Sequence, residues 1–134
     1  MTPPALCTCL PGATLWLNGA LRHPVAEELA DRLRDGHHRR VEVLDPAASA
    51  VPGESRRAAA ERVGLVAEIL ARHGILAVVT APDGAAADLD RVRSRHRRAD
   101  AVFLETAPAG PDAATPTVDV LLALLAEHGL VPVG

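Results

Sequence analysis

The sequence predicts an α/β protein, a three-layer sandwich in which helices cover both faces of a mostly parallel sheet of four to five strands. Two observations carry this prediction. Four short apolar runs, each of strand length, alternate with four segments whose apolar residues recur at helical spacing. A glycine also stands at or just after the end of most of the helical segments, where it commonly stops a helix.

The four predicted strands are runs of mostly apolar residues bounded by turn-forming ones. Pro46 halts the second strand, and the third is apolar throughout, as expected where both faces of a parallel sheet are covered. The strands are residues 13–17, 41–45, 75–79 and 101–105. Ligands of such sheets bind beyond the carboxyl ends of the strands. The loops at those ends are 18–24, 45–55, 80–85 and 106–115.

The first two predicted helices each show one apolar face. The first carries Val25, Leu29 and Leu33, and we expect it to stop at Gly36. The second runs from 55 to 73 and is closed by the glycine that follows. The residues predicted on its inward face are Val63, Val66, Ala67 and Leu70.

The third and fourth helices are predicted in the same way. The third spans about residues 85–98, and the residues on its inward stripe are Leu89, Val92 and His96. We expect Thr115 to cap the fourth helix, Pro116 to occupy its first turn and Gly129 to close it. Its apolar residues are Val118, Leu121, Leu122 and Leu125.

The composition excludes several classes of function. Trp16 and Phe103 are the whole aromatic set, so base stacking, the usual device of proteins that bind single-stranded nucleic acid, is nearly absent. A net charge of -3 creates no field that favours nucleic acid or an anionic membrane. All 14 basic residues are arginines, which removes Schiff-base chemistry, a lysine base and a lysine that reaches a nucleotide phosphate.

The length of 134 residues suits one domain, which we place at 13–134 after an N-terminal segment at 1–12. Cys7 and Cys9 lie in that segment; a closed zinc site wants four ligands, so we expect ordinary reduced thiols and no metal. No apolar run approaches the roughly 20 residues of a membrane span. The first residues carry no basic stretch typical of a signal peptide, so we expect a cytoplasmic protein.

Several segments resemble adenylylsulfate (APS) kinases, which have the P-loop fold. Residues 12–19 are similar to the first strand running into the phosphate loop, and 41–45 to the second strand. Residues 62–74 give the most specific match, and 102–106 and 121–129 resemble the fourth strand and the terminal helix. The resemblance covers nearly the whole chain in collinear order. It implies a P-loop-kinase-like domain.

The resemblance fails at the phosphate loop. The family loop has the form Gly-x-x-Gly-x-Gly-Lys-Ser, in which amides cradle phosphate, the lysine reaches it and the serine holds Mg²⁺. Here Gly19 is followed by Ala-Leu-Arg-His-Pro-Val, with no second glycine, lysine or hydroxyl. Pro24 removes a further donor amide. We therefore expect no catalytic residues, no cofactor and no ATP-dependent phosphotransfer.

The substrate side of the family pattern is also reduced. Asp45 followed by proline stands where the family has Asp-Gly-Asp, and Arg56 with Ala59 stands where it has Arg-x-x-Asn. The loop 81–84 lacks the family's arginine, and only 107–112 and a few neighbours replace the lid. These departures argue against the family's reaction.

Three residues are retained as candidates for binding a nucleotide or a small anion: Arg22, Asp45 and Arg56. Asp45 ends a strand at the carboxyl edge, although a turn carboxylate before proline is the ordinary interpretation. Arg56 opens a helix where an anion could bind, although a solvated first turn is the ordinary interpretation. Arg22 is the basic residue nearest to the reduced phosphate loop.

The remaining charged residues favour structural roles. Five arginines between 91 and 98 suggest a nucleic-acid patch at first, but Asp88 and Asp90 partly neutralise them, and a solvated face or a protein contact is favoured. His73 and His128 precede helix-ending glycines, where an imidazolium suits the helix dipole. The dipeptide His37-His38 is poor evidence for metal.

These observations lead to a ranked set of hypotheses. The first is a non-catalytic pseudo-kinase, in sulfur or specialised metabolism, that pairs with itself or docks on a neighbouring enzyme. The alternatives are an anion- or nucleotide-binding module and an enzyme repurposed for other chemistry in the same cleft. A homodimer is expected because Leu65 and Ile69 widen the apolar stripe of the second helix beyond what one sheet face needs.

Overall fold

The computed structural model describes residues 10–48, 51–81, 89–106 and 114–132. Its four strands are all parallel and form one sheet in the order β2-β3-β1-β4. The strands are β1 (Ala13–Leu17), β2 (Val41–Leu44), β3 (Leu76–Thr80) and β4 (Val102–Glu105). The predicted α/β architecture with a parallel sheet is thus confirmed.

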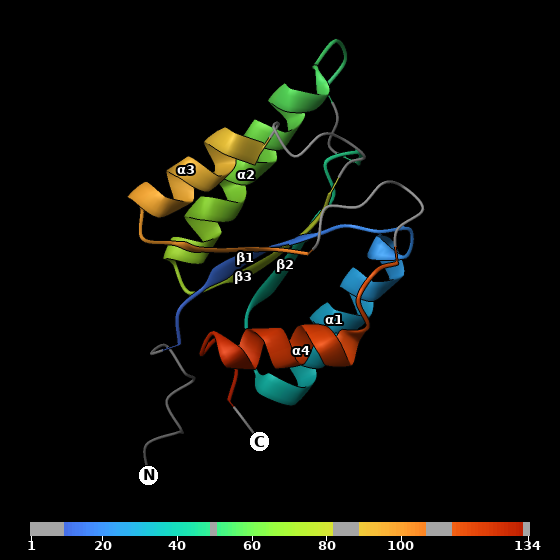
Figure 1. The fold of residues 1–134 in the computed structure, drawn as a ribbon, viewed down its shortest axis with the longest axis vertical. Helices are drawn as coiled ribbons and strands as arrows, with labels where there is room; N and C mark the ends of the chain where they lie inside the picture. The colour runs from blue at the N-terminus through green and yellow to red at the C-terminus, as the bar shows by residue number, and fades with distance from the viewer. Residues whose placement is uncertain (1–9, 49–50, 82–88, 107–113, 133–134) are drawn as a thin grey trace.

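Four helices cover the two faces of this sheet. They are α1 (Arg22–His37), α2 (Arg56–Arg72), α3 (Asp90–Arg98) and α4 (Val118–Glu127). The helices α1 and α4 lie on one face, and α2 and α3 lie on the other (Figure 1). Among the described helices, none is long and apolar enough to cross a membrane.

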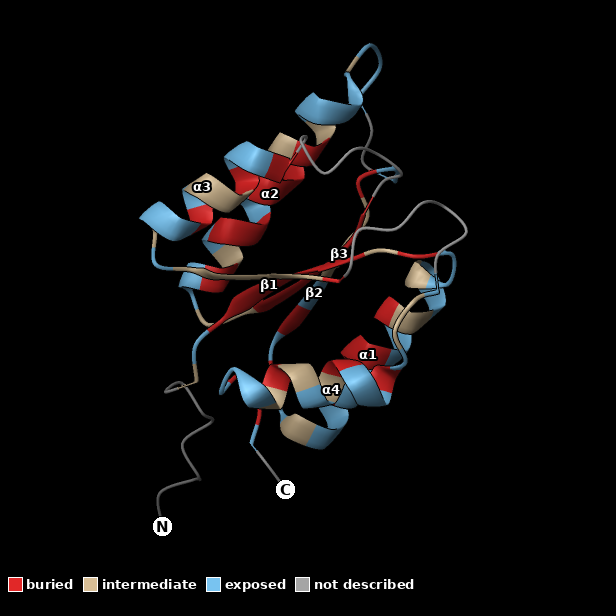
Figure 2. Ribbon diagram, viewed as in Figure 1, coloured by how far each residue is buried: buried red, intermediate tan, exposed pale blue. Residues whose placement is uncertain are grey.

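The strand β1 occupies the middle of the sheet and divides the core in two. All five of its residues are buried (Figure 2). Leu15 and Leu17 belong to the apolar cluster under α1 and α4, whereas Trp16 belongs to the cluster under α2 and α3. This alternation follows from the two-residue repeat of a strand.

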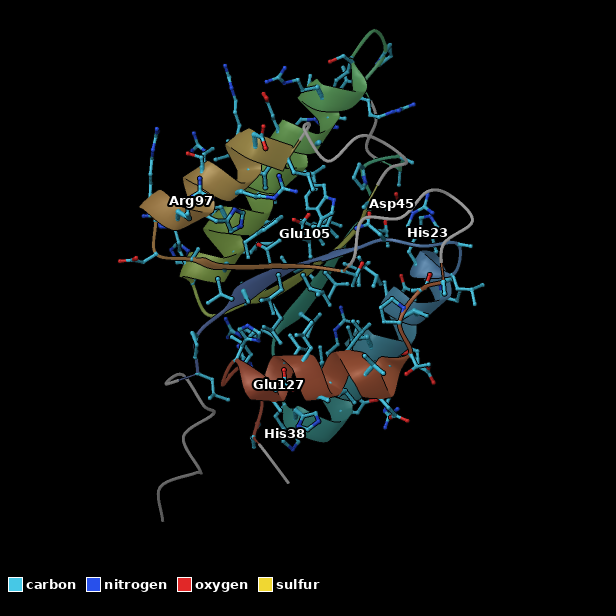
Figure 3. The ribbon with its side chains drawn as sticks, in the orientation of Figure 1. His23, His38, Asp45, Arg97, Glu105 and Glu127 are labelled. Carbon is cyan, nitrogen blue, oxygen red and sulfur yellow. The ribbon has the colours of Figure 1, made fainter. Side chains whose placement is uncertain are left out.

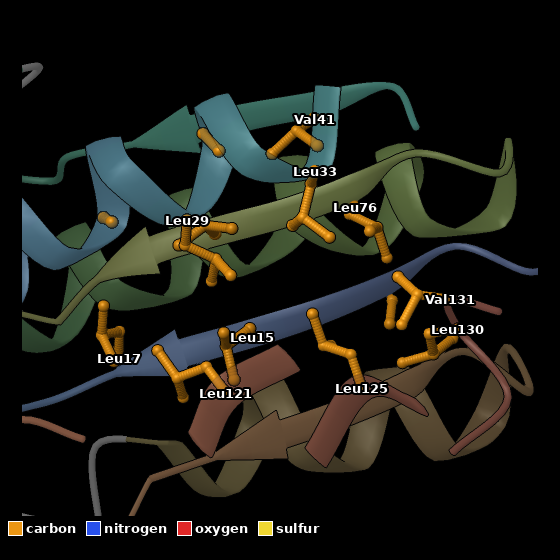
Figure 4. Packing of buried hydrophobic residues seen from close by; sticks show 14 of the residues in the cluster. Leu15, Leu17, Leu29, Leu33, Val41, Leu76, Leu121, Leu125, Leu130 and Val131 are labelled. Carbon is orange, nitrogen blue, oxygen red and sulfur yellow. The ribbon is translucent and has the colours of Figure 1, made fainter. Parts of the chain in front are cut away.

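Leucines dominate the cluster under α1 and α4. Leu29 and Leu33 of α1 and Leu121 and Leu125 of α4 converge on the sheet in Figure 4, and all four are essentially inaccessible to solvent. Burial of each such side chain contributes about 1.5–3 kcal/mol. This face confirms the inward residues predicted for the first and fourth helices.

The opposite cluster is built around small residues on α2. Ala60 and Ala67 are buried there, and a methyl group added to Gly64 would lie 2.6 Å from a methyl carbon of Val92. The helices α2 and α3 therefore approach closely. Val63 faces this cluster as predicted, but the inward position predicted for Val66 is wrong: its side chain is 42% exposed. The small residues define the inner face of α2, which turns Val66 to solvent.

Two helix ends differ from the prediction. Gly36 does not stop α1; it lies inside the helix, and His38 ends the helix in the left-handed conformation with φ 53°. The His38 amide then bonds to the carbonyl of Leu33, a common helix stop. Thr117, not Thr115, caps α4, because the Thr117 side chain accepts the amide of Val120.

A buried histidine links α3 to the central strand. His96, predicted to face inward, is 1% exposed; its Nδ1 lies 2.8 Å from the Val92 carbonyl and its Nε2 lies 2.8 Å from the Thr14 hydroxyl. The ring also contacts Phe103, with centroids 4.9 Å apart. Nδ1 donates to the Val92 carbonyl, and in the neutral ring Nε2 accepts a hydrogen bond from the Thr14 hydroxyl. Burial lowers the pKa of His96 from its ordinary value of 6.5, partly opposed by the Val92 hydrogen bond.

This lowered pKa predicts a loss of stability in acid. As pH falls below 6.5, the unfolded chain binds a proton at His96 that the folded chain rejects, so the free energy of unfolding decreases until the folded pKa is reached. Thermal unfolding of the wild type and of His96→Gln, followed by circular dichroism between about pH 7.5 and pH 5, should show a smaller pH dependence in the variant.

His128→Gln is the matched control, because the His128 ring bonds to the carbonyl four residues earlier in the same way but is exposed. This control should retain the wild-type pH dependence. If acidification lowered the stability of the wild type and of His96→Gln equally, the prediction would be contradicted.

Candidate functional site

The carboxyl ends of the four strands meet at one edge of the sheet, which holds the described loop residues 18–21, 45–48 and 106. In parallel α/β sheets this edge is where ligands bind. The contacts of these residues decide which chemistry the edge supports. The candidate residues in loops 82–88 and 107–113, together with Cys7 and Cys9, lie outside the described residues.

The loop after β1 is held by two threonines from distant parts of the chain. The Asn18 amide donates to the Thr106 hydroxyl at 2.8 Å, and the Asn18 side-chain amide donates to the Thr106 carbonyl at 3.2 Å. At the start of α1, the Leu21 amide donates to the Thr115 hydroxyl at 2.8 Å. In this loop, the backbone amides of Asn18 and Leu21 are thus satisfied by the protein's own hydroxyl groups.

Gly19 makes this closure possible. Its φ of +116° is rarely adopted by residues with a side chain, and an added methyl group would lie 2.2 Å from the Thr115 hydroxyl oxygen. The same methyl group would lie 2.8 Å from the Thr115 Cα, so rotation of the threonine side chain would not relieve the contact. The loop therefore packs directly against residue 115.

The predicted anion ligand Arg22 is the first residue of α1 and is half-buried. Its Nη1 donates to the carbonyl of Gly19 at 3.0 Å, and its backbone amide points to the same carbonyl at 3.3 Å. The guanidinium thus folds back on the loop and stabilises its conformation. This contact competes with any contact to a bound anion.

Asp45 follows β2, as predicted, and the structure adds a partner that the sequence did not suggest. His23 Nδ1 lies 3.9 Å from one Asp45 oxygen, and the other oxygen accepts the Ala47 amide at 3.1 Å (Figure 3). Both side chains are substantially exposed. Solvent therefore screens this pair, and it contributes little to stability. In the sequence, only the position of His23 just after the loop that follows β1 could have suggested it as a partner of Asp45.

Arg56 is exposed at the first position of α2. Ser55 caps this helix as expected, since its hydroxyl accepts the Ala58 amide at 3.1 Å. Among the described residues, no hydrogen bond or ion pair joins Arg56 to Arg22 or to Asp45. Arg56 is thus not joined to the other two predicted ligands by a direct contact within the described ranges.

The arginines of α3 are largely engaged in ion pairs. Arg93 lies 2.8 Å from Glu105, Arg91 lies 3.8 Å from Glu61, and Arg95 lies 3.4 Å from the buried Glu68. These pairs join α3 to α2 and to β4, which supports a structural role over a nucleic-acid patch. Within the described ranges, no group of three or more His, Cys, Asp and Glu side chains could hold a metal ion.

No protein-family model matches the sequence, and no curated protein sequence matches it. Solved structures of APS kinases do match the fold. A cysteine-to-alanine variant of the APS kinase CysC of Mycobacterium tuberculosis has a TM-score of 0.67 and 24% sequence identity, over 88% of this chain and 96% of that chain.

Two further structures give the same result. The Mycobacterium tuberculosis APS kinase CysC in complex with AMPPNP and APS has a TM-score of 0.61 and 26% identity, over 72% of this chain and 61% of that chain. The hexameric APS kinase from Thiobacillus denitrificans has a TM-score of 0.72 and 20% identity, over 93% of this chain and 31% of that chain. The chain therefore has an APS kinase-like P-loop fold.

The surroundings of Gly19 and Gly36 predict opposite effects on stability when each is replaced by alanine. Gly19→Ala should destabilise the protein by about 1–3 kcal/mol, because alanine is strained at this φ and its methyl group meets the Thr115 backbone. Gly36→Ala should stabilise it by about 0.5–1 kcal/mol, because Gly36 lies inside α1 with open space at its Cβ position. Urea unfolding of both variants measures the difference, and a neutral Gly19→Ala substitution would contradict the packing described for this loop.

Proposed function

We propose that this chain is a non-catalytic relative of APS kinases that acts through protein contacts, in sulfur or specialised metabolism. The observation that carries the proposal is the contact between the Leu21 amide and the Thr115 hydroxyl. It occupies the start of α1, which is the position where a P-loop kinase would cradle phosphate. The fold is retained while the phosphate-binding chemistry is replaced by internal hydrogen bonds.

The missing groups are those on which phosphoryl transfer depends. This reaction relies almost entirely on positioning and electrostatic stabilisation by backbone amides, a lysine and Mg²⁺. The sequence contains no lysine, and the residues after Gly19 supply no hydroxyl for Mg²⁺. Arg22 offers a positive charge, but its Nη1 donates to the Gly19 carbonyl. A single guanidinium in this position does not replace the preorganised loop.

An anion-binding module at the carboxyl edge is the alternative, and it has less support. The Asp45 carboxylate at this edge repels an anion, and Arg56 makes no direct contact with Arg22 or Asp45 among the described residues. The ion pair with His23 partly offsets the Asp45 charge only while that imidazole is protonated.

Protein contact is proposed through α2. Leu65, Val66 and Ile69 are 38%, 42% and 45% exposed, and together they form what we call the α2 patch. Ile69 follows Leu65 by four positions and Val66 by three, and side chains at these spacings are neighbours on a helix, so the three side chains are contiguous. Exposed apolar groups of this kind mark interfaces more often than isolated ones do. We propose a second copy of the chain as the partner, in keeping with the hexameric assembly of the Thiobacillus denitrificans APS kinase.

The proposal predicts that the purified protein does not convert APS to its phosphorylated product with Mg-ATP. Calorimetry should likewise detect no ATP binding tighter than about millimolar, because the triphosphate needs aligned amides and a cation to offset its lost hydration. Product formation, measured by chromatography of the nucleotides, should equal that of a control without protein.

An active APS kinase assayed in parallel confirms that the conditions support the reaction. Product above the protein-free control, or a low-micromolar dissociation constant for ATP, would overturn the proposed loss of catalysis.

Self-association predicts a molecular mass of twice 14.0 kDa in light scattering at micromolar concentrations. Ile69→Arg places a charge in the α2 patch and should convert the protein to monomer while leaving the far-ultraviolet circular dichroism unchanged. Val120→Arg is the matched control, since Val120 is an exposed aliphatic residue on another helix, α4, at 57% exposure.

The control variant should remain dimeric. A wild-type mass near 14.0 kDa throughout the concentration range would reject the dimer. Dissociation by both variants would place the interface away from the α2 patch.

A further inference from the structure

A concave surface lies at the edge of the sheet where the strands begin, opposite the carboxyl edge. It is a groove of about 650 Å³, a volume typical of sites for small molecules. We call it the amino-edge groove. Residues that precede each of the four strands contribute to its lining: Gly12, Arg40, Gly74 and Ala101. The carboxyl ends of α2 and α3 lie on the same side of the molecule (Figure 1).

A buried arginine forms part of the groove wall. Arg39 is 6% exposed, and its guanidinium donates to the carbonyls of Pro11 at 2.8 Å and Gly74 at 3.2 Å, and also to that of Leu130. These three carbonyls come from segments far apart in the sequence, so Arg39 holds the segments together. It also fixes a positive charge in the wall, because a guanidinium stays protonated in proteins.

The more exposed lining of the groove is also basic. The lining includes Arg40, Arg72 and His73, against one acidic residue, Asp100. Arg40 is exposed and forms no ion pair with any carboxylate of the described residues. Arg72 approaches one Glu68 oxygen at 3.7 Å but remains about half exposed. The groove therefore has more positive than negative side chains available to a ligand.

The end of α2 does not account for these charges. Basic residues often lie near a helix terminus because they complement its dipole and its last carbonyls. Here the carbonyls of Leu70 and Ala71 already accept the backbone amides of Ile75 and Gly74, and the His73 ring bonds to the carbonyl of Ile69. The guanidinium of Arg40 is therefore not needed to close this helix.

We propose that the amino-edge groove binds a phosphate or sulfate group, free or carried on a small organic molecule. Arg40 and Arg72 act as its ligands, and Arg39 supplies a fixed charge in the wall. A guanidinium matches the geometry of such an oxyanion with two parallel donors. The groove is larger than one oxyanion requires, which leaves room for an organic body. This site is separate from the carboxyl edge, so the proposal of anion binding does not depend on whether the chain is catalytically inactive.

The test is a titration of the ¹⁵N-labelled protein with inorganic phosphate, sulfate and adenosine 5′-phosphate, followed by NMR. The amide resonances of residues 38–40 and 72–74 should shift and saturate. Arg40→Ser should weaken binding by about tenfold or more, the usual effect of losing a charge-assisted hydrogen bond. Arg57→Ser is the matched control: it removes an exposed arginine from the first turn of α2, at the opposite edge, and should leave the affinity unchanged.

The probes separate the two sources of the oxyanion. Tighter binding of adenosine 5′-phosphate than of phosphate supports an organic ligand, and equal affinities support the free oxyanion in the same groove. Three results would overturn the proposal. They are shifts confined to residues 18–23 and 45–48, no saturation at tens of millimolar, which is weaker than usual ligand affinities, and equal weakening by Arg40→Ser and Arg57→Ser. Circular dichroism of Arg40→Ser confirms that the variant is folded.

Discussion

The structure depends on the packing of β1 from every side. This strand has β3 and β4 at its two edges and helices over both faces, which bury its backbone polar groups and the Thr14 hydroxyl. Each must be satisfied within the protein. The Thr14 hydroxyl bonds to His96, Arg39 holds Pro11 just before the strand, and Thr106 accepts the amide of Asn18 just after it. These contacts place α3, the start of β2 and the end of β4 relative to the central strand.

Features that depend on short-range sequence patterns could be predicted from the sequence. Apolar runs and helical spacing located every described strand and helix to within a few residues, and they placed His96 on the inner face of α3. The predictions were wrong where contacts between residues far apart in the sequence determine the local structure. Threonine is a common helix cap, yet the Thr115 hydroxyl accepts the backbone amide of Leu21, 94 positions away. Large apolar residues are expected in a core, which favours an inward Val66. In the structure, Gly64 and its small neighbours instead form the close contact of α2 with α3.

The two edges of the sheet differ in how their polar groups are used. At the carboxyl edge, Asp45 and Arg22 lie where the sequence placed them, but their contacts with His23 and with the Gly19 carbonyl could not be predicted. Those contacts depend on how the loop after β1 closes, which no local motif encodes. At the amino edge, the helix end is closed by backbone hydrogen bonds, and the guanidinium of Arg40 adds positive charge beyond that requirement. The fold thus separates internal hydrogen bonding at one edge from surplus charge at the other.

The strand order also determines when the strands can pair while the chain is being translated. In the described sheet, β1 and β2 do not pair with each other; each pairs with β3, and β1 also pairs with β4. Both early strands must therefore wait until residues 76–80 have left the ribosome before any ladder forms. During that interval two apolar segments remain exposed on the nascent chain, a state prone to aggregation. Slow translation just before β3 would lengthen this exposure, whereas a pause after it would give the sheet time to assemble around its central pair.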